Sequence, residues 1–333
     1  MNCAYKLIHS MCTPRVVKTK GPIVNPEKNI DLSNVVILDC GNSFEYDFSA
    51  ISESSKLNPF DTLSPVSDDT APCVPVVIPH SERKAYSLEM AHQLHAARVK
   101  EALERGYYVF SIGGSNDQSF PNALALMELV GAKNTAVVNI DAHLDVRPLI
   151  DPPVQTPADP HTHTYSPLPS FTGGKGVAHS GSPFRQLLQY PGFQGSSFAE
   201  FACQGSQCSA EHANFARGAG GELHWLSEIQ KGGKTVDAFR NLLVRLSGDE
   251  KVVFVSFDID SVAGSDAPGV SCPGSVGLSA QEAVDMSFIA GQQKSVKLFD
   301  LSELCPTVEG YRTPLLATFM FYNWLLGIAS SKL

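Results

Sequence analysis

The chain contains two almost uninterrupted apolar runs that each end in closely spaced aspartates. The first reads VVNIDAHLDVRP over residues 137–148, and the second reads VFVSFDID over residues 253–260. Strands this apolar belong in parallel sheets whose two faces are both covered. Carboxylates gathered at the end of such a strand repel or desolvate one another unless a positive charge lies among them. We therefore expect both runs to be central strands that lead into a charged site.

Further apolar runs recur along the chain, with helical patterns between them. The expected strands are residues 35–39, 107–112, 135–140, 251–257 and 296–299, and the expected helices are residues 83–105, 235–246 and 314–328. This alternation predicts an α/β fold, a three-layer α/β/α sandwich with a mostly parallel, doubly wound sheet. We expect a single domain over residues 1–333, with a long loop rich in Pro and His at residues 148–183 that covers the substrate.

The composition limits the partners and the compartment. The net charge of −9 argues against nucleic acid or an anionic membrane as a main partner. No apolar run approaches the ~20 residues that span a bilayer. The eight cysteines lack CxxC spacing, which fits a reducing compartment. The sequence closes with SKL at residues 331–333, which predicts a peroxisome-type organelle such as the glycosome, with the cytoplasm as the alternative.

The strand ends supply the candidate metal ligands. Asp141, His143 and Asp145 occupy every second position, so in a strand they would face the same side. Asp258 and Asp260 repeat this spacing at the end of the second run. If the two ends are neighbours, four carboxylates and one imidazole can hold two divalent cations. This donor set favours Mn²⁺ over Mg²⁺ or Fe²⁺. For either motif alone, a strand end with solvated acids is the simpler alternative.

A third strand end, FSIGGSNDQS at residues 110–119, adds a Gly-Gly turn followed by a polar residue. Together with NIDAHLD and SFDID, this turn resembles the arginase/ureohydrolase superfamily from about residue 100 to the C-terminus. The resemblance implies an arginase-like fold, two Mn²⁺ ions per subunit, and hydrolysis of C–N bonds in guanidino or formimino groups. It also implies a homo-oligomer, either a trimer or a dimer of trimers.

The resemblance assigns a role to each candidate ligand. Asp141 and Asp258 would bridge the two ions. Asp145 would complete the ligand shell of one ion, and His143 and Asp260 that of the other. Asp145 would also orient a metal-activated water.

Two positions depart from the family pattern. Asn116 stands in the Gly-Gly turn where the family usually has His. An amide oxygen is a weaker donor than an imidazole, so we expect lower metal affinity at that site. After Asp260, the family's Asp-Pro is replaced by Ala263-Gly264, which leaves the hydrogen bonding around the ligands in doubt.

Three further motifs resemble the formiminoglutamase branch of the superfamily. HSGSPF at residues 179–184 resembles HSGTPF, APGVSCP at residues 267–273 resembles APGVSAP, and ELCP at residues 303–306 matches Glu-x-x-Pro. The implied reaction converts N-formimino-L-glutamate to glutamate and formamide. The candidate catalytic residues are Asp145, Glu303 and the proton shuttle His179, and the candidate substrate-binding residues are Arg147, Glu303, Ser180 and Gly181.

Arg147 bears on the choice of substrate, because arginases carry Asn at this place. Its guanidinium fork suits capture of a substrate carboxylate. A simpler alternative is that Arg147 only balances the charge of the nearby acids. Agmatine, which lacks a carboxylate, is disfavoured, whereas arginine stays open as a substrate.

The sequence is also compatible with a chain that has lost catalysis. An inactive arginase-like binding or scaffold protein would account for Asn116 and Ala263-Gly264. Separately, Cys40 and Cys272 could form a disulfide in metal-free protein, although two unconnected thiols are the simpler expectation.

Overall fold

The computed structural model describes residues 88–149 and 178–331, together with short segments at residues 16–17, 24–32, 35, 37–38, 45–47 and 77–79. Its centre is a six-stranded, all-parallel sheet with the strand order β10-β9-β8-β11-β12-β7. The strands are β7 (Val109–Ile112), β8 (Thr135–Ile140), β9 (Phe198–Cys203), β10 (Glu222–Trp225), β11 (Val252–Asp258) and β12 (Val296–Ser302).

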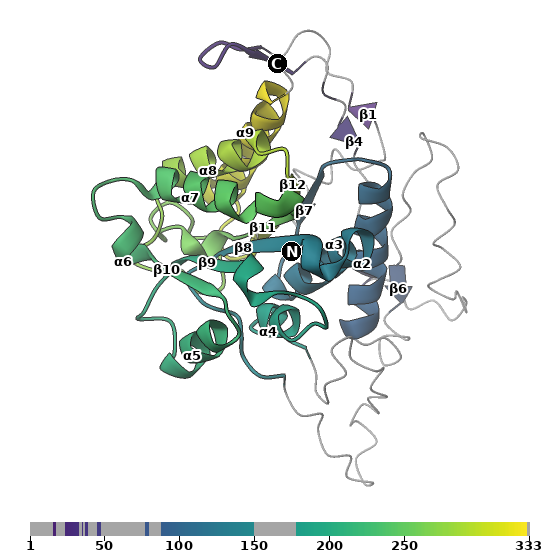
Figure 1. Cartoon of the computed structure of the whole chain (residues 1–333). Coiled ribbons are helices and arrows are strands. Elements are labelled where there is room, and N and C mark those ends of the chain that lie inside the picture. Colours follow the sequence, from purple (N-terminus) through teal and green to yellow (C-terminus); the bar gives the residue numbers. More distant parts are fainter. Residues whose placement is uncertain are drawn as a thin grey trace.

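Helices cover both faces of this sheet. Figure 1 shows α7, α8 and α9 on one side and α3, α4 and α5 on the other. The helices are α2 (Leu88–Glu104), α3 (Ser119–Val130), α4 (Pro183–Leu188), α5 (Ala210–Gly218), α6 (Leu226–Ile229), α7 (Thr235–Leu246), α8 (Ala280–Gln292) and α9 (Arg312–Ser330), with 3-10 turns η2 (Asn116–Gln118), η3 (Ala132–Asn134), η4 (Gly195–Ser197), η5 (Gly248–Glu250) and η6 (Ile259–Ser261). The predicted α/β/α sandwich is confirmed. No helix among the described residues has the length and apolar character to cross a membrane.

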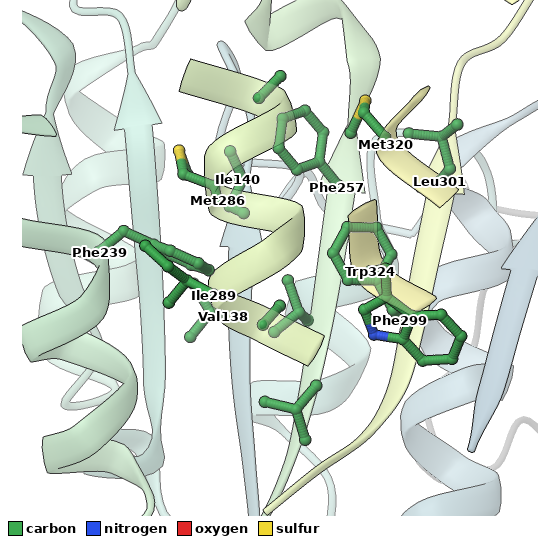
Figure 2. Packing of buried hydrophobic residues seen from close by; sticks show 14 of the residues in the cluster. Val138, Ile140, Phe239, Phe257, Met286, Ile289, Phe299, Leu301, Met320 and Trp324 are labelled. Atoms are coloured by element: carbon green, nitrogen blue, oxygen red, sulfur yellow. The ribbon is translucent and has the colours of Figure 1, made fainter. Parts of the chain in front are cut away.

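Alternate residues of the central strands pack into two separate hydrophobic cores. Val138 and Ile140 of β8, with Phe257 of β11, point toward α7, α8 and α9 (Figure 2). Val137 of β8 and Phe254 of β11 pack on the opposite face with residues of α2 to α5. Because both faces are buried, these strands carry apolar residues at most positions. The sequence pattern of the two central runs follows from this burial.

The remaining strands lie outside the main sheet. Residues 37–38 were expected to belong to a parallel strand, yet as β4 (Ile37–Leu38) they pair antiparallel with β1 (Val16–Val17). That prediction is wrong, because a short apolar run fits a two-stranded ladder as well as a sheet core. Two further short ladders join β2 (Val24–Asn25) to β3 (Ile30–Asp31) and β5 (Glu45–Asp47) to β6 (Val77–Pro79).

Sequence patterning located most central elements but overlooked two strands of the sheet. Residues 135–140 and 235–246 form the expected strand and helix with the predicted bounds. The strands β9 and β10 were not predicted, because a glutamate interrupts the apolar run of the first and the second is a half-buried edge strand of four residues. Cys40, residues 150–177 and residues 332–333 lie outside the described residues, so the disulfide, the covering loop and the organelle address stay predictions.

Helices α8 and α9 cross at backbone contact through two glycines. A Cβ atom added at Gly291 would collide with the carbonyl oxygen of Trp324, and one added at Gly327 would collide with that of Phe288. Close approach of this kind leaves no room for a methyl group. The packing of α8 on α9, which covers β11 and β12, therefore depends on these two positions.

We expect Gly327→Ala to lower the free energy of unfolding by about 1–3 kcal/mol through overpacking, although alanine is normally the better helix residue. Urea unfolding followed by circular dichroism measures the change. The control is Gly218→Ala at the end of α5, where an added Cβ meets no atom within 4 Å. Equal effects of the two substitutions would contradict the close helix crossing.

Candidate metal centre

The register of the two central strands brings their acidic ends together. Ile140 of β8 lies opposite Phe257 of β11, so the residues that follow, Asp141 and Asp258, leave the sheet side by side. Both carboxyl groups are buried. Asp141, Asp145 and Asp258 each offer an oxygen within 4.8 Å of the others. This meeting of strand ends is the condition that the two-cation interpretation required.

A second group of ligand atoms shares Asp141 with the first. Asp141, His143 and Asp260 also offer atoms that all lie within 4.8 Å of one another. His143 Nδ1 is 3.3 Å from Asp141 Oδ1 and 3.3 Å from Asp260 Oδ2. Two adjacent groups with one shared carboxylate form a geometry in which that carboxylate can bridge two cations.

The sequence spacing suggested that strand alternation aligns these side chains. In the structure their alignment has a different origin. Strand β8 ends at Ile140, and the residues after it are irregular. Asp145 adopts a positive φ of 43°, which turns the chain so that its carboxylate returns toward Asp141. Glu303 likewise has a φ of 58°. Non-glycine residues in this region cost about 1–3 kcal/mol each, and such strain is concentrated at functional sites.

The closely packed acids of the cluster shift the pKa values of one another and of His143. Hydrogen bonds with Asp141 and Asp260 raise the pKa of His143 to about 12, so its ring is an imidazolium at neutral pH. Burial, followed by the nearby carboxylates, raises the pKa of Asp145 and of Asp258 well above the usual range. Burial also raises the pKa of Asp260 to about 6. The close packing of these groups therefore favours their protonated forms.

The donor set fits a divalent cation. Asp260 Oδ1 is buried without a hydrogen-bond partner among the described residues, which leaves a strong acceptor unsatisfied in the middle of the cluster. The remaining donors are carboxylate oxygens and one imidazole nitrogen, with no thiolate in either group. Oxygen-rich sites with a single imidazole suit Mn²⁺. A bound ion would replace the protons and satisfy the unpartnered oxygen.

Asn116, which lies in η2, directs its side-chain amide nitrogen toward the cluster. Its Nδ2 donates to Asp145 Oδ2 at 2.9 Å and to Asp141 Oδ2 at 3.3 Å. Its Oδ1 accepts from the hydroxyls of Ser119 at 2.6 Å and Ser302 at 3.1 Å. In this orientation the amide acts as a hydrogen-bond donor to the acids. Ligation of a metal by Oδ1, as predicted, requires the amide to turn over, and both serine hydroxyls can then accept from Nδ2.

Glu303 lies at the edge of the same site. Its Oε1 accepts from the backbone N–H of Asn116 at 3.1 Å, and its Oε2 accepts from the hydroxyl of Ser271 at 2.7 Å. The backbone N–H of Cys305 donates to Gly269 O at 2.8 Å. These contacts bring the motifs ELCP and APGVSCP together beside the carboxylates, as their shared role requires.

The remaining predicted site residues contact one another and form a separate group. The backbone N–H of Arg147 donates to Gly181 O at 2.8 Å, and a Cβ on Gly181 would press against the Arg147 side chain. His179 donates from Nε2 to Pro148 O at 3.0 Å and accepts from the Gly181 N–H at Nδ1. Ser180 is exposed between them. Among the described residues, no hydrogen bond joins His179 to the carboxylates, and its assignment as a proton shuttle stays a prediction.

Several buried polar residues behind the cluster escaped the sequence analysis. Asp300 accepts from Ser119 at 3.0 Å and from Asn122 at 2.9 Å, and its burial raises its pKa to about 6. On β8 and β9, Asn139 and Glu200 pair with each other. A polar residue inside an apolar run, as in VVNID and FAEFAC, was the available signal. Hydrophobic patterning treats such a polar residue as an interruption of a strand, so these residues were not identified as part of the site.

Comparisons with known proteins agree with this geometry. A model of the Arginase family matches residues 15–327. A crystal structure of formiminoglutamase from Trypanosoma cruzi with Mn²⁺ is 46% identical and covers 73% of each chain, with a TM-score of 0.62. Another structure of that enzyme, oxidized and with Mn²⁺ at pH 8.5, is 35% identical and covers 98% of this chain and 84% of its own, with a TM-score of 0.66.

A relative known from its sequence points the same way. The formimidoylglutamase of Aeromonas salmonicida (strain A449) is 26% identical over 226 residues, which make up 67% of this chain and 63% of that protein. The chain therefore spans less than two thirds of the length of this relative.

We expect Mn²⁺ to bind with release of protons and to bind more weakly as the pH falls. Because the raised pKa of His143 keeps its ring protonated far above neutrality, ligation must displace that proton. Each proton released weakens apparent binding by about tenfold per pH unit below the displaced pKa. Calorimetry in two buffers of different ionisation enthalpy counts the protons. The variant His143→Gln should release fewer, and an affinity independent of pH would contradict the protonated cluster.

Proposed function

The chain belongs to the arginase family, and we propose that it is a manganese-dependent formiminoglutamase. The reaction is hydrolysis of the formimino C–N bond of N-formimino-L-glutamate to glutamate and formamide. The observation that carries the proposal is the pair of ligand groups that share Asp141 at the ends of β8 and β11. The Mn²⁺-bound formiminoglutamase from Trypanosoma cruzi and the three branch motifs support this substrate over different amidines.

We assign the metal ligands from the two groups of atoms. Asp141 would be shared, with Asp145 and Asp258 on one side and His143 and Asp260 on the other. Two Mn²⁺ ions bound there would supply a water whose pKa is lowered toward neutrality. Asp145 would hold and orient that water through a hydrogen bond to its carboxylate. Asp145 lies in the irregular segment after β8, where its positive φ turns the carboxylate toward Asp141.

Glu303 is the residue assigned to the reacting group of the substrate. A formimino group is a planar cation with N–H donors, and the Glu303 carboxylate is positioned by Ser271 and by the Asn116 backbone to accept from them. Its backbone N–H also donates to Gly114 O at 2.5 Å, which ties it to the Gly-Gly turn. A preorganised carboxylate stabilises the cationic amidine as its carbon becomes tetrahedral.

Arg147 is assigned to the glutamate portion of the substrate. Its side chain is exposed, and the Gly181 backbone fixes its main chain beside the HSGSPF motif. An exposed guanidinium can form a two-pronged pair with an α- or γ-carboxylate. Arginine also carries a carboxylate, so the identity of the cleaved group is decided by assay rather than by Arg147.

The proposal extends to the assembly as well. We propose that the enzyme is a homo-oligomer, a trimer or a dimer of trimers, as the family resemblance implies. Size-exclusion chromatography with light scattering measures the mass of the assembly directly.

The protein reconstituted with Mn²⁺ at mildly alkaline pH should release formamide from N-formimino-L-glutamate and no urea from arginine. Urea release instead would make it an arginase-type enzyme. Two bound ions without either product would favour the inactive scaffold.

We expect Glu303→Gln to lower kcat/KM by on the order of 10²–10³, because a neutral amide binds and orients the cationic amidine poorly. Its Mn²⁺ content, measured by atomic emission, should stay unchanged. The matched control is Glu104→Gln, at the exposed end of α2. Loss of metal together with activity would show that Glu303 acts as a ligand instead.

We expect Arg147→Gln to raise KM far more than it lowers kcat, because a carboxylate contact remote from the reacting carbon contributes mainly to binding. Steady-state kinetics separate the two constants. The control is Arg217→Gln. Arg217 is an exposed residue of α5 whose guanidinium lies over the Trp225 ring. A fall in Mn²⁺ affinity with KM unchanged would instead assign Arg147 the role of a counter-charge.

A further inference from the structure

Glu200 is a buried carboxyl group in the middle of β9 that belongs to neither group of candidate ligands. It is fully buried, and its Oε2 accepts a hydrogen bond from Asn139 Nδ2 at 2.8 Å. Its Oε1 has no hydrogen-bond partner among the described residues. Burying a carboxyl group that is half satisfied costs about 1–3 kcal/mol, and an aliphatic residue in a central strand would avoid this cost. The glutamate therefore needs an explanation beyond packing.

Asn139 links this carboxyl group to the metal centre. Asn139 and Glu200 lie directly opposite each other in the register of β8 and β9, and both are fully buried. The same Asn139 Nδ2 that reaches Glu200 lies 3.3 Å from Asp141 Oδ2. One amide nitrogen thus bridges the buried glutamate and the carboxylate shared by the two ligand groups.

The contacts of Asp141 show why this amide matters. Its Oδ1 accepts from the backbone N–H of His143 at 2.7 Å, and its Oδ2 lies 3.3 Å from both Asn116 Nδ2 and Asn139 Nδ2. If Asn116 turns its oxygen toward a cation, it ceases to donate to Asp141. Asn139 is then the side-chain donor that continues to orient this carboxylate.

An asparagine amide can point either end toward a carboxylate, and its neighbours decide which. Burial, together with the charges of Asp141 and Asp145, raises the pKa of Glu200 well above its usual range. A carboxyl oxygen at 2.8 Å accepts from the Asn139 nitrogen and would disfavour the opposite orientation of the amide. That orientation would direct the amide oxygen at Asp141 and weaken the ligand.

We propose that Glu200 is a positioning residue for the metal centre, which fixes the Asn139 amide so that its nitrogen holds Asp141 in the bridging position. The inference rests on the proposed metal-dependent function. Partners behind the ligands of a metal site commonly change the affinity by about 10–100-fold when they are removed.

The test measures the dissociation constant of Mn²⁺ by electron paramagnetic resonance for the full chain and its variants. Glu200→Leu and Asn139→Leu should each weaken binding by about 10–100-fold. Glu200→Gln keeps an acceptor oxygen for the Asn139 nitrogen and should bind like the wild type. Because the two residues act as one unit, the double variant should lose less than the product of the single losses.

Thr235→Val, which removes a buried and unpartnered hydroxyl at the start of α7, is the control for loss of a buried polar group. It should leave the Mn²⁺ affinity unchanged. Unfolding of the metal-free variants separates a loss of fold from a loss of affinity, and Asn139→Ser interrupts the same link should Glu200→Leu fail to fold.

The outcomes separate this inference from the proposed function. A wild-type chain that binds no Mn²⁺ refutes the metal-dependent function itself. A wild type that binds Mn²⁺, with an unchanged affinity in Glu200→Leu or in Asn139→Ser, overturns the role of Glu200 alone. A Glu200→Gln variant as weak as Glu200→Leu overturns the role of the acceptor oxygen at this position.

Discussion

Repulsion among carboxylates at the carboxyl edge of the sheet is the interaction on which the rest of the site depends. Two unit charges 4 Å apart repel by about 4 kcal/mol at an effective dielectric constant of 20. Asp141 offers an oxygen within 4.8 Å of oxygens of Asp145 and Asp258 in one group and of Asp260 in the other. The His143 imidazolium, the raised pKa values of the acids and the Asn116 amide offset this repulsion. Every further feature of the edge follows from how these acids are held and neutralised.

The scaffold imposes this crowding because its strands are rigid. With both faces of β8 and β11 buried, a slip of one residue in register would exchange side chains between the two cores and disrupt the packing of both. The strain of the positive φ angles at Asp145 and Glu303 is borne by the same packing. Side chains that would drift apart in a flexible loop are therefore held within reach of one another. This rigidity is what a metal site with fixed ligand geometry requires.

The sequence predicted the parts of the site that lie in the most regular elements. Apolar runs and their terminal aspartates were sufficient to identify β8 and β11, because a buried central strand tolerates few different patterns. The same rule overlooked β9, where Glu200 interrupts the apolar run. Whether a buried polar residue breaks a strand or serves a neighbour depends on the tertiary contact, here Asn139, which the linear sequence does not contain.

The orientation of Asn116 could not be predicted for a related reason. Residue type indicated a possible ligand, but the direction of an amide is decided by Ser119 and Ser302 on one side and by the acids on the other. Those partners come from three different parts of the fold. The irregular path after Ile140 was also missed, because spacing alone cannot tell a strand from a turn that brings the same side chains together.

Asn116 and His143 together let the protein satisfy its own acids. Ligation of an ion by either residue would break the contacts that it makes with the acids. A substitution at Asn116 or His143 would therefore change the stability of the fold as well as the affinity for an ion.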